Sequence, residues 1–403
     1  MLRGLARIIC ELQDAACDPE KGFAAPSGLP TIHGSVVMRP EFVEARFETL
    51  DKLDDLLGAD GVWSRSSLDD TLWDFIARIA DLQPGRRSDG IAKAVEETAG
   101  RFNEVPSSWV VDIIVYGFDQ GCAGVRFGRI LLIAEDIDAI ALQHQKFDGF
   151  PRGTQVLARL ETTAIDERSA REHAESILDE HLLIINALCA RDVPSPIQVS
   201  RTDHIRPLYS ATRIAGDQTA ARLYTSAQHR RIPLAGPELR EETEGPVGGR
   251  VHAMLNGPDN EFNRRVLLGY QYAGAACVDH HPERSFLMLA IALESSILGK
   301  DTKTELTYQL GARVAHLIGN GLLGRKLVAR TVNDLYDRRS RIVHAGQYGV
   351  SRREAILMFF YCKTALTMLV MAPSFRSFTT NTDLEGWFKD RILDGPNHYP
   401  SGS

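Results

Sequence analysis

Residues 336–346 read YDRRSRIVHAG, and this stretch decides how the last third of the chain is interpreted. Arg339 is followed directly by Ser340, and His344 comes four residues after that serine. Arginine is a permanently charged, forked donor that suits a phosphate, and histidine exchanges a proton near neutral pH. Together they are the minimum equipment for cutting a phosphodiester without a metal. Because both also occur as solvated surface groups, the flanking sequence has to support this interpretation.

The composition is that of a soluble globular protein. The 403 residues are 44% hydrophobic and 25% charged, which is enough for two or three domains with real cores. The formal net charge of −7 argues against a general polyanion binder, so any nucleic-acid contact must come from a local basic patch. The six cysteines are scattered without a C-x-x-C pair, which favours free thiols over a disulfide frame or a zinc site. We predict neither a metal nor a cofactor.

The sequence predicts a cytoplasmic protein that does not contact a membrane. The first ten residues are mildly amphipathic and lack the long apolar core and the cleavage site of a signal peptide. No apolar run approaches the roughly 18 residues that are needed to span a bilayer.

The N-terminal half, residues 1–200, is predicted to be a mixed α/β domain without a recognised function. Residues 1–40 are expected to form a short helix and then a loop, and Ser67 with Asp70 resembles a helix start. The segment 124–133 is expected to pair with the strand before it. The predicted elements in this half are helices within 40–81, strands over 107–116, 124–133 and 155–165, and a helix over 167–188.

The rest of the chain is predicted to be a proline-punctuated connector over 201–260, an all-α bundle over 261–373 and a tail over 374–403. The fold class is therefore α+β. Ser351 with Glu354 forms a capping box that starts the last bundle helix, and Pro373 ends it. Apolar residues of the tail, Leu384, Trp387 and Phe388, are expected to dock back. The other predicted bundle helices are 263–279, 282–298, 303–318 and 325–342.

The segment 263–371 resembles a HEPN domain, in particular its Apea-like branch. The resemblance is carried by Ala292-Leu293-Glu294, by Arg313-Val314-Ala315 and by residues 335–344, LYDRRSRIVH. It covers about a quarter of the chain. The resemblance implies a small α-helical domain that dimerises and often acts as a metal-independent ribonuclease in phage defence or toxin systems.

Helix geometry limits how Arg339 and His344 can work together. Five residues along an unbroken helix correspond to about 500°, so the two side chains point about 140° apart and cannot share one phosphate. Either the helix breaks near Val343, as Gly346 and Gly349 permit, or partners converge across a two-fold interface.

In such a site each side chain has a distinct expected role. His344 takes the proton of the ribose 2′-hydroxyl or supplies one to the leaving 5′-oxygen. Arg339 stabilises the charge on the phosphoryl oxygens, and Ser340 holds the phosphate or orients the histidine. The substrate is then RNA, and the product carries a 2′,3′-cyclic phosphate. The alternative is an inert surface arginine and a histidine that caps a helix end.

Supporting residues are expected around this pair. Glu294 lies on the apolar side of its predicted helix and is expected to pair with Arg313 or Arg339, because a buried carboxylate needs a partner. Tyr336 is expected to pack in the core or at the dimer seam, and Arg341 lies inside the motif. The basic residues expected to contact RNA are Arg325, Lys326, Arg330, Arg338, Arg352 and Arg353, with Asp334 and Asp337 as the acids among them.

Three other patterns are set aside. Residues 319–324 match G-x-G-x-x-G but follow a helix, so we predict an interhelical loop rather than a nucleotide site. Asp279-His280-His281 has no further ligands at a sensible spacing and is predicted to be a surface turn. Residues 245–249 lack the lysine and hydroxyl residue of a phosphate-binding Walker loop.

The sequence thus predicts a dimeric endoribonuclease, an antiphage, abortive-infection or toxin effector. Its N-terminal domain is expected to sense or recruit a phage or host protein. A second hypothesis is a non-catalytic RNA-binding or dimerisation module in a regulatory or defence complex. A third, in which the N-terminal half has its own enzymatic activity, finds no nucleophile and base at a suitable spacing.

Overall fold

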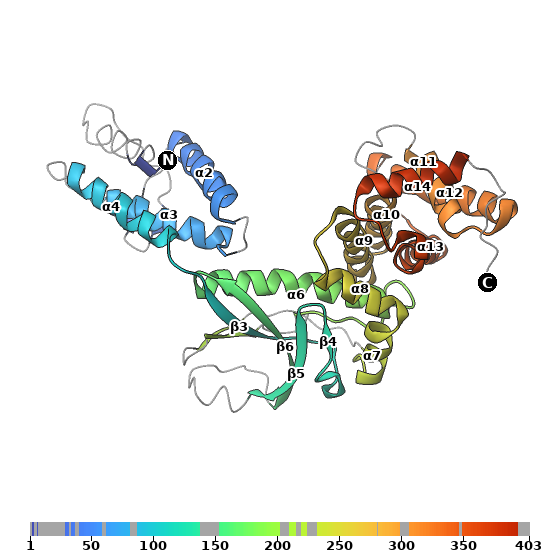
Figure 1. Ribbon diagram of the computed structural model, residues 1–403, viewed down its shortest axis with the longest axis horizontal. Coiled ribbons are helices and arrows are strands. Elements are labelled where there is room, and N and C mark those ends of the chain that lie inside the picture. Colours follow the sequence, from blue (N-terminus) through green and yellow to red (C-terminus); the bar gives the residue numbers. More distant parts are fainter. Residues whose placement is uncertain are drawn as a thin grey trace. The chain divides into compact units, whose positions relative to one another are not determined.

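Figure 1 shows the protein as a computed structural model. The structure describes residues 2–3, 6, 29–31, 34–36, 40–58, 62–80, 87–137, 153–201, 209–214, 219–223, 232–279, 281–298, 306–345 and 349–393.

The chain divides into two compact units whose boundaries differ from the predicted ones at residues 200 and 260. Several elements contribute residues to both units, so no boundary falls in a linker. One unit comprises Met1–Val111, Glu161–Ser176 and Ala211–Ala220. The other comprises Asp112–Leu160, Ile177–Ser210 and Ala221–Ser403.

The first unit is built from helices around one apolar core. The core includes Leu50, Leu72, Phe75 and Ile76, which recur at helical spacing. The residue that caps α3 is Ser64, three positions before Ser67, because the Ser64 hydroxyl accepts a hydrogen bond from the Ser67 amide (3.2 Å). The elements are β1 (Leu29–Thr31), β2 (Gly34–Val36), α2 (Pro40–Leu53), a π-helical turn (Asp54–Gly58), α3 (Arg65–Ala80) and α4 (Arg87–Phe102).

Six strands form one sheet in the order β4-β5-β6-β3-β7-β8. The predicted pairing of 124–133 with 107–116 is wrong, because β6 lies between β5 and β3. The segment itself is a hairpin that turns at Gly128, where φ is 55°. The strands are β3 (Ser107–Ile114), β4 (Arg126–Phe127), β5 (Ile130–Asp136), β6 (Thr154–Ala164), β7 (Tyr209–Ile214) and β8 (Thr219–Leu223).

Helix α6 (Glu167–Cys189) runs alongside the sheet, as Figure 1 shows. Two histidines fasten helices to the β4–β5 hairpin. His181 Nε2 on α6 accepts a hydrogen bond from the Arg129 amide (3.2 Å), and His252 Nδ1 accepts one from the Gly128 amide (3.0 Å). A side chain at Gly128 would place its Cβ 2.2 Å from His181 Nε2. The hairpin therefore approaches α6 as closely as a glycine allows.

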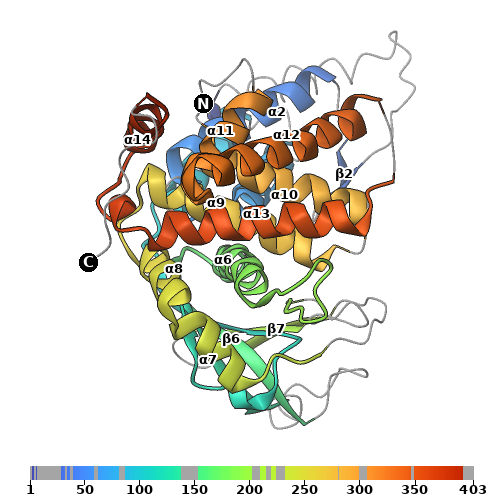
Figure 2. The same cartoon turned by 90° about the vertical axis from the view of Figure 1, so that its right-hand side faces the viewer.

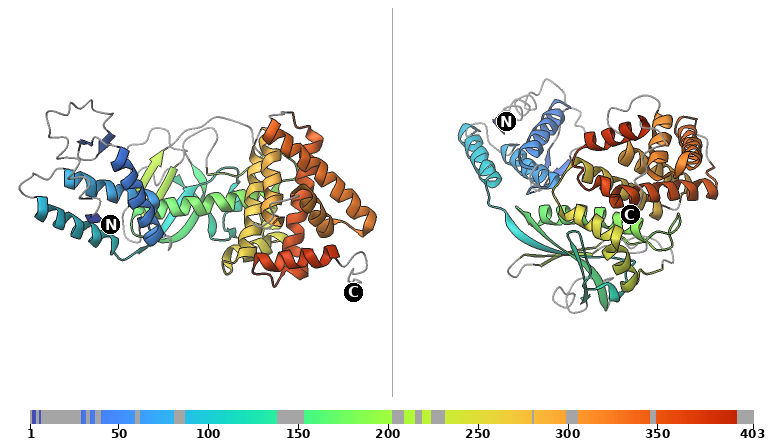
Figure 3. Two further views of the ribbon diagram at one scale, coloured as in Figure 1. Left: turned by 90° about the horizontal axis from the view of Figure 1, so that it is seen from above. Right: turned by 45° about the vertical axis from the view of Figure 1, so that its right-hand side comes forward.

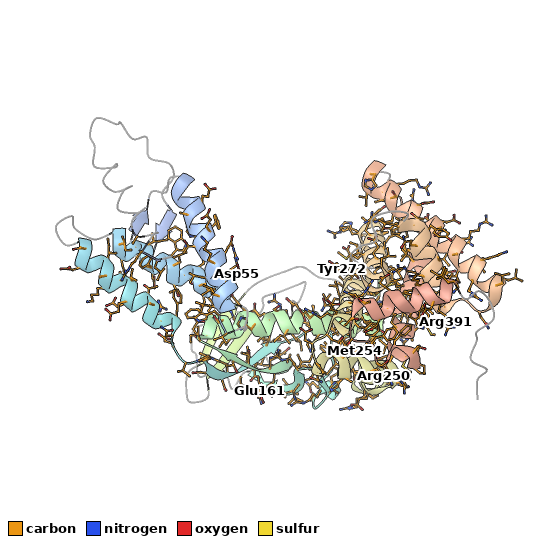
Figure 4. All side chains as sticks on the ribbon, turned by 45° about the horizontal axis from the view of Figure 1, so that its top comes forward. Asp55, Glu161, Arg250, Met254, Tyr272 and Arg391 are labelled. Carbon is orange, nitrogen blue, oxygen red and sulfur yellow. The ribbon has the colours of Figure 1, made fainter. Side chains whose placement is uncertain are left out.

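The remaining helices follow, and all but the first of them gather into one bundle, coloured yellow to red in Figure 3. The predicted helix starts at Pro282 and after Ser351 are confirmed, and the capping box of Ser351 and Glu354 is formed in both directions. In Figure 4, Arg250 and Met254 mark α8 and Tyr272 marks α9. The helices are α7 (Gly236–Glu244), α8 (Pro246–Asn256), α9 (Glu261–Val278), α10 (Pro282–Ile297), α11 (Leu306–Ile318), α12 (Gly321–Ala345), α13 (Arg352–Met371) and α14 (Asn381–Leu393).

Two predictions about this region need correction, and a third is confirmed. The connector over 201–260 contains α7 and α8, which begin at Pro237 and Pro246, and also the strands β7 and β8, which were not predicted. The glycine pattern at 319–324 is a loop only in its first two residues, since α12 begins at Gly321. The tail contains α14, which docks through Leu384 and Phe388 as expected.

Helix α13 lies against α9 and α10 in the bundle (Figure 2). Among the described residues it is the one helix that is long and apolar enough to cross a membrane by length and composition. Half of its apolar window is buried.

We predict that the β4–β5 hairpin loosens as the pH falls. Burial, opposed by the hydrogen bond to the Ile177 carbonyl and reinforced by the charges of Arg129 and His252, lowers the pKa of His181 from 6.5 to about 4. Between these two values the unfolded chain binds the proton and the folded chain does not, so stability is lost as pH falls through 6.5 towards 4, by roughly 2–3 kcal/mol. Hydrogen exchange of residues 125–135, corrected for intrinsic rates, should show lower protection at pH 5 than at pH 7.5.

The His181→Gln variant keeps a neutral acceptor and should lose most of this pH dependence. His281→Gln, at an exposed position, should behave as the wild type. An equal loss of protection in all three proteins would contradict the assignment to His181.

Candidate active site

Helix α12 carries the motif that the sequence singled out, and it is continuous to Ala345. The first alternative, a helix break near Val343, is therefore wrong. Arg339 and His344 both lie on unbroken helix, about 140° apart around its axis and about 7.5 Å apart along it. In one copy of the chain they face different directions.

Arg339 points towards α10. Its Nε lies 3.3 Å from Glu294 Oε1, and its guanidinium carbon lies 5.5 Å from the centre of the Tyr336 ring. The side chains of Arg339 and Glu294 are 24% and 25% exposed, so the pair is open to solvent on one side. Of the two partners left open for Glu294, the structure selects Arg339.

Tyr336 is the third residue of this cluster. It is buried in the bundle core, one of the two positions expected for it. Burial, the negative charge of Glu294 and a hydrogen bond to that carboxylate raise the pKa of Tyr336 to about 12. The phenol therefore stays protonated and donates to Glu294, which in turn holds Arg339. These three side chains form a positioning cluster for the arginine.

His344 lies in the last turn of α12 and is exposed. Ser340 stands one turn before it on the same side of the helix, since residues four apart are neighbours on a helix surface. It is half-buried. The structure thus brings Ser340 and His344 together and separates both from Arg339.

Arg338 is held by residues at and just before the start of α13. Its Nη2 donates a hydrogen bond to the Gly349 carbonyl, and its Nε lies 3.6 Å from Glu354 Oε1. The Gly349 amide donates to Glu283 Oε1 at 3.1 Å, and hydrogen bonds from backbone amides lower the pKa of Glu283. Glu283 was not predicted, although an acid directly after Pro282 is typical of a first helical turn.

The other basic residues divide into an exposed stripe and engaged side chains. The exposed stripe follows one side of α12 over about 27 Å and contains four exposed basic residues, Lys326, Arg330, Arg341 and His344. Asp334 and Asp337 lie on the same side, so neighbouring members of the stripe are three or four residues apart. The acids separate the stripe into two basic ends.

Three of the predicted RNA contacts have other partners or lie off α12. Arg325 Nη1 lies 3.3 Å from His316 Nδ1, and Arg352 Nη2 donates to Asp192 at 3.1 Å. Arg353 is exposed at the start of α13. These residues therefore extend the basic surface less than the sequence suggested.

Arg313 belongs to a different part of the bundle. It is buried, donates to the Ile297 carbonyl (3.1 Å), and pairs with Glu385 of α14 through Nη1 and Nη2 at 2.8 and 2.6 Å. Arg313 is therefore not the partner of Glu294, which pairs with Arg339.

Metal ligands do not gather in the part of the chain that the structure describes, where no group of three His, Cys, Asp or Glu side chains is suitably placed. Asp279 accepts a hydrogen bond from the His281 amide (2.8 Å) in the turn before α10. His280 lies outside the described residues.

No protein-family model matches the chain, and neither a curated protein nor a solved structure gives a significant match.

We predict that Arg338→Ala destabilises residues 349–354 at the start of α13. The change leaves the Gly349 carbonyl and Glu354 without this donor, which should cost about 1–3 kcal/mol. Hydrogen exchange of residues 349–356 measures the loss. Arg341→Ala removes an exposed arginine three residues on and should change protection there by less than about 0.5 kcal/mol. A similar loss of protection in both variants would show that Arg338 does not stabilise the start of α13.

Proposed function

We propose that the chain is a metal-independent endoribonuclease of the HEPN type whose active site is completed by a second copy of the chain. The observation that carries the proposal is the division of the motif on α12. Arg339 is aimed by Glu294 and Tyr336, while His344 stands free on the outer side with Ser340 beside it.

The need for a second copy follows from this division. An arginine and a histidine about 140° apart on one straight helix cannot contact the same phosphate. A two-fold axis places two copies of one surface against each other, so Arg339 of one copy approaches His344 of the other.

Exposed apolar side chains near the motif suit such a contact. Val343, one turn after Arg339, is 49% exposed. Ile356 and Phe360, one turn apart on α13, are 39% and 57% exposed. Packing against a second copy would remove this apolar surface from water.

The proposed reaction is a transesterification within the RNA strand. His344 of one copy removes the proton of the ribose 2′-hydroxyl, whose oxygen then bonds to the adjacent phosphorus. The bond from phosphorus to the 5′-oxygen breaks, and that oxygen takes a proton from water or from the protonated histidine. Arg339 stabilises the charge on the phosphoryl oxygens. The products are a 2′,3′-cyclic phosphate and a 5′-hydroxyl.

A second candidate function is RNA binding without cleavage. It is favoured by the exposed stripe of Lys326, Arg330 and Arg341, which contacts a phosphate backbone without using Arg339. The two functions differ in whether purified protein cuts RNA.

The cellular setting is proposed from the family resemblance alone. A cytoplasmic antiphage, abortive-infection or toxin effector fits a ribonuclease that has to be restrained. The N-terminal unit would then recognise a phage or host protein.

We predict that Arg339→Ala and His344→Ala each abolish RNA cleavage. Each change removes one of the two groups that act on the phosphate, so the rate should fall at least about 100-fold. Total RNA is incubated with wild type and variants, with and without EDTA, and the cut ends are mapped. Wild-type cleavage should resist EDTA and leave cyclic phosphates.

Matched controls are Arg376→Ala and His281→Ala, which replace exposed residues outside α12. They should cleave as the wild type does. Cleavage that needs a divalent metal, or that persists in both α12 variants, would rule out the proposed site.

We further predict that the two inactive variants restore each other. A heterodimer of Arg339→Ala and His344→Ala retains one intact Arg339 and one intact His344 on different copies, which meet in one site. Random mixing makes about half of the dimers heterodimers, so partial activity should return. The mixture is unfolded, refolded and assayed beside each variant alone. If both groups acted from one copy, the mixture would stay inactive.

A further inference from the structure

The first turns of α12 present leucines to solvent. Leu322, Leu323 and Leu327 are 55%, 82% and 65% exposed. Two bases on the same turns, Lys326 and Arg330, are exposed as well. We call these five residues the leucine face. Single exposed leucines are normal on a soluble protein, but an apolar patch rimmed by polar groups marks a surface that contacts something else.

Helix geometry places the leucine face on one side of α12. At 100° per residue its five members fall within an arc of about 140°. The other side of the same turns carries Gly324, Arg325, Val328 and Ala329, which are half-buried. In these turns α12 therefore meets the bundle through small apolar residues and an arginine, and its large apolar side chains point away from the bundle.

The charge of this end of α12 is positive. Residues 319–333 read GNGLLGRKLVARTVN and contain three bases and no acid, in a chain with a net charge of −7. Arg325 is directed to His316, with 3.3 Å between Nη1 and Nδ1, so Lys326 and Arg330 are the bases of the outward side. The next charged residue on that side is the acid Asp334. The leucine face thus combines exposed apolar groups with an outward positive charge.

This combination selects one kind of partner. An isologous contact with a second copy would set Lys326 and Arg330 against the same two bases, and like charges repel. RNA would pair with the bases but leave the leucines unused. A helix of another protein docks into a groove, whereas the leucine face is the convex side of one helix. An anionic membrane surface accepts both the leucines and the bases.

We propose that the leucine face binds the surface of an anionic lipid membrane. The three leucines enter the boundary between headgroups and acyl chains. Lys326 and Arg330 lay their aliphatic stems beside them and direct their charges to the headgroups. α12 lies on the surface without crossing it. The lack of a spanning segment, from which the sequence predicted no membrane contact, does not bear on a contact of this kind.

The membrane contact leaves the motif at the other end of α12 free. His344 lies about 25 Å further along the helix than Leu327. Between them, Asp334 and Asp337 are exposed on the same side, and an anionic surface repels their carboxylates. The contact therefore ends before the motif. The inference goes beyond the proposed function and does not depend on it, since a chain that cannot cleave RNA would still bind the membrane.

The test is flotation of the full chain with two kinds of vesicle. One is phosphatidylcholine alone, and the other is equal parts of phosphatidylcholine and phosphatidylglycerol. Binding to the anionic vesicles should be at least about tenfold tighter than to the neutral ones, because two bases face the headgroups. Added salt should weaken it. No binding to the anionic vesicles, or equal binding to both kinds, overturns the proposal.

The double variant Leu323→Ser with Leu327→Ser removes the apolar part of the face. It should weaken binding to the anionic vesicles at least about tenfold, because two side chains no longer leave water. The matched control is Leu56→Ser with Leu393→Ser, which replaces leucines that are 72% and 73% exposed elsewhere and should bind as the wild type does. Unchanged binding by the first pair overturns the proposal.

A second double variant tests the charges. Lys326→Gln with Arg330→Gln should lose the preference for anionic vesicles, while Arg376→Gln with Lys389→Gln, at exposed positions outside α12, should keep it. Sedimentation velocity and binding of a single-stranded RNA are measured on the same proteins. If the serine pair on α12 dissociates an oligomer or loses RNA binding, the leucine face belongs to a second copy or to RNA, and the proposal is overturned.

Discussion

A straight α-helix turns by about 100° at each residue, and this constraint governs the candidate site. Because α12 does not break before Ala345, its motif is divided between two sides of one helix. The inner side carries Tyr336 and Arg339, which are held by the bundle. The outer side carries His344, which is not. Dimerisation is therefore a geometric requirement of the proposed chemistry.

The arginines of the bundle are paired with carboxylates in two different ways. Arg339 meets one carboxylate, Glu294, and both remain partly open to water, so the arginine is held in place and still reachable. Arg265 and Arg313 are almost fully enclosed and divide a single carboxylate between them. The first arrangement suits a group that has to approach a substrate. The second leaves two guanidinium charges facing one carboxylate, which suits a structural role inside the bundle.

Local sequence signals predicted the bundle well. The capping box at Ser351 and the proline at 282 depend on contacts within one turn of helix, so both starts were correct. The pairing of Glu294 with an arginine also followed from its apolar surroundings, although the choice of Arg339 needed the packing of α10 and α12.

Features that depend on distant residues were not predictable in the same way. The order of the sheet inserts β6 between β5 and β3, and strand pattern alone carries no information about neighbours. Arg338 looked like a free base in the sequence, but its partner Gly349 is a backbone carbonyl further along the chain that it contacts only in the folded structure. Arg265 gave no signal, since one arginine in an amphipathic helix is ordinary.

The close approach of Gly128 to the His181 ring couples two positions that are far apart in the chain. Any larger residue at 128 would collide with that imidazole, and a smaller residue at 181 would leave the Arg129 amide without its acceptor. Among relatives of this protein the two sites should consequently change together, as a compensating pair. A substitution at only one of the two positions would disturb the contact between the hairpin and α6.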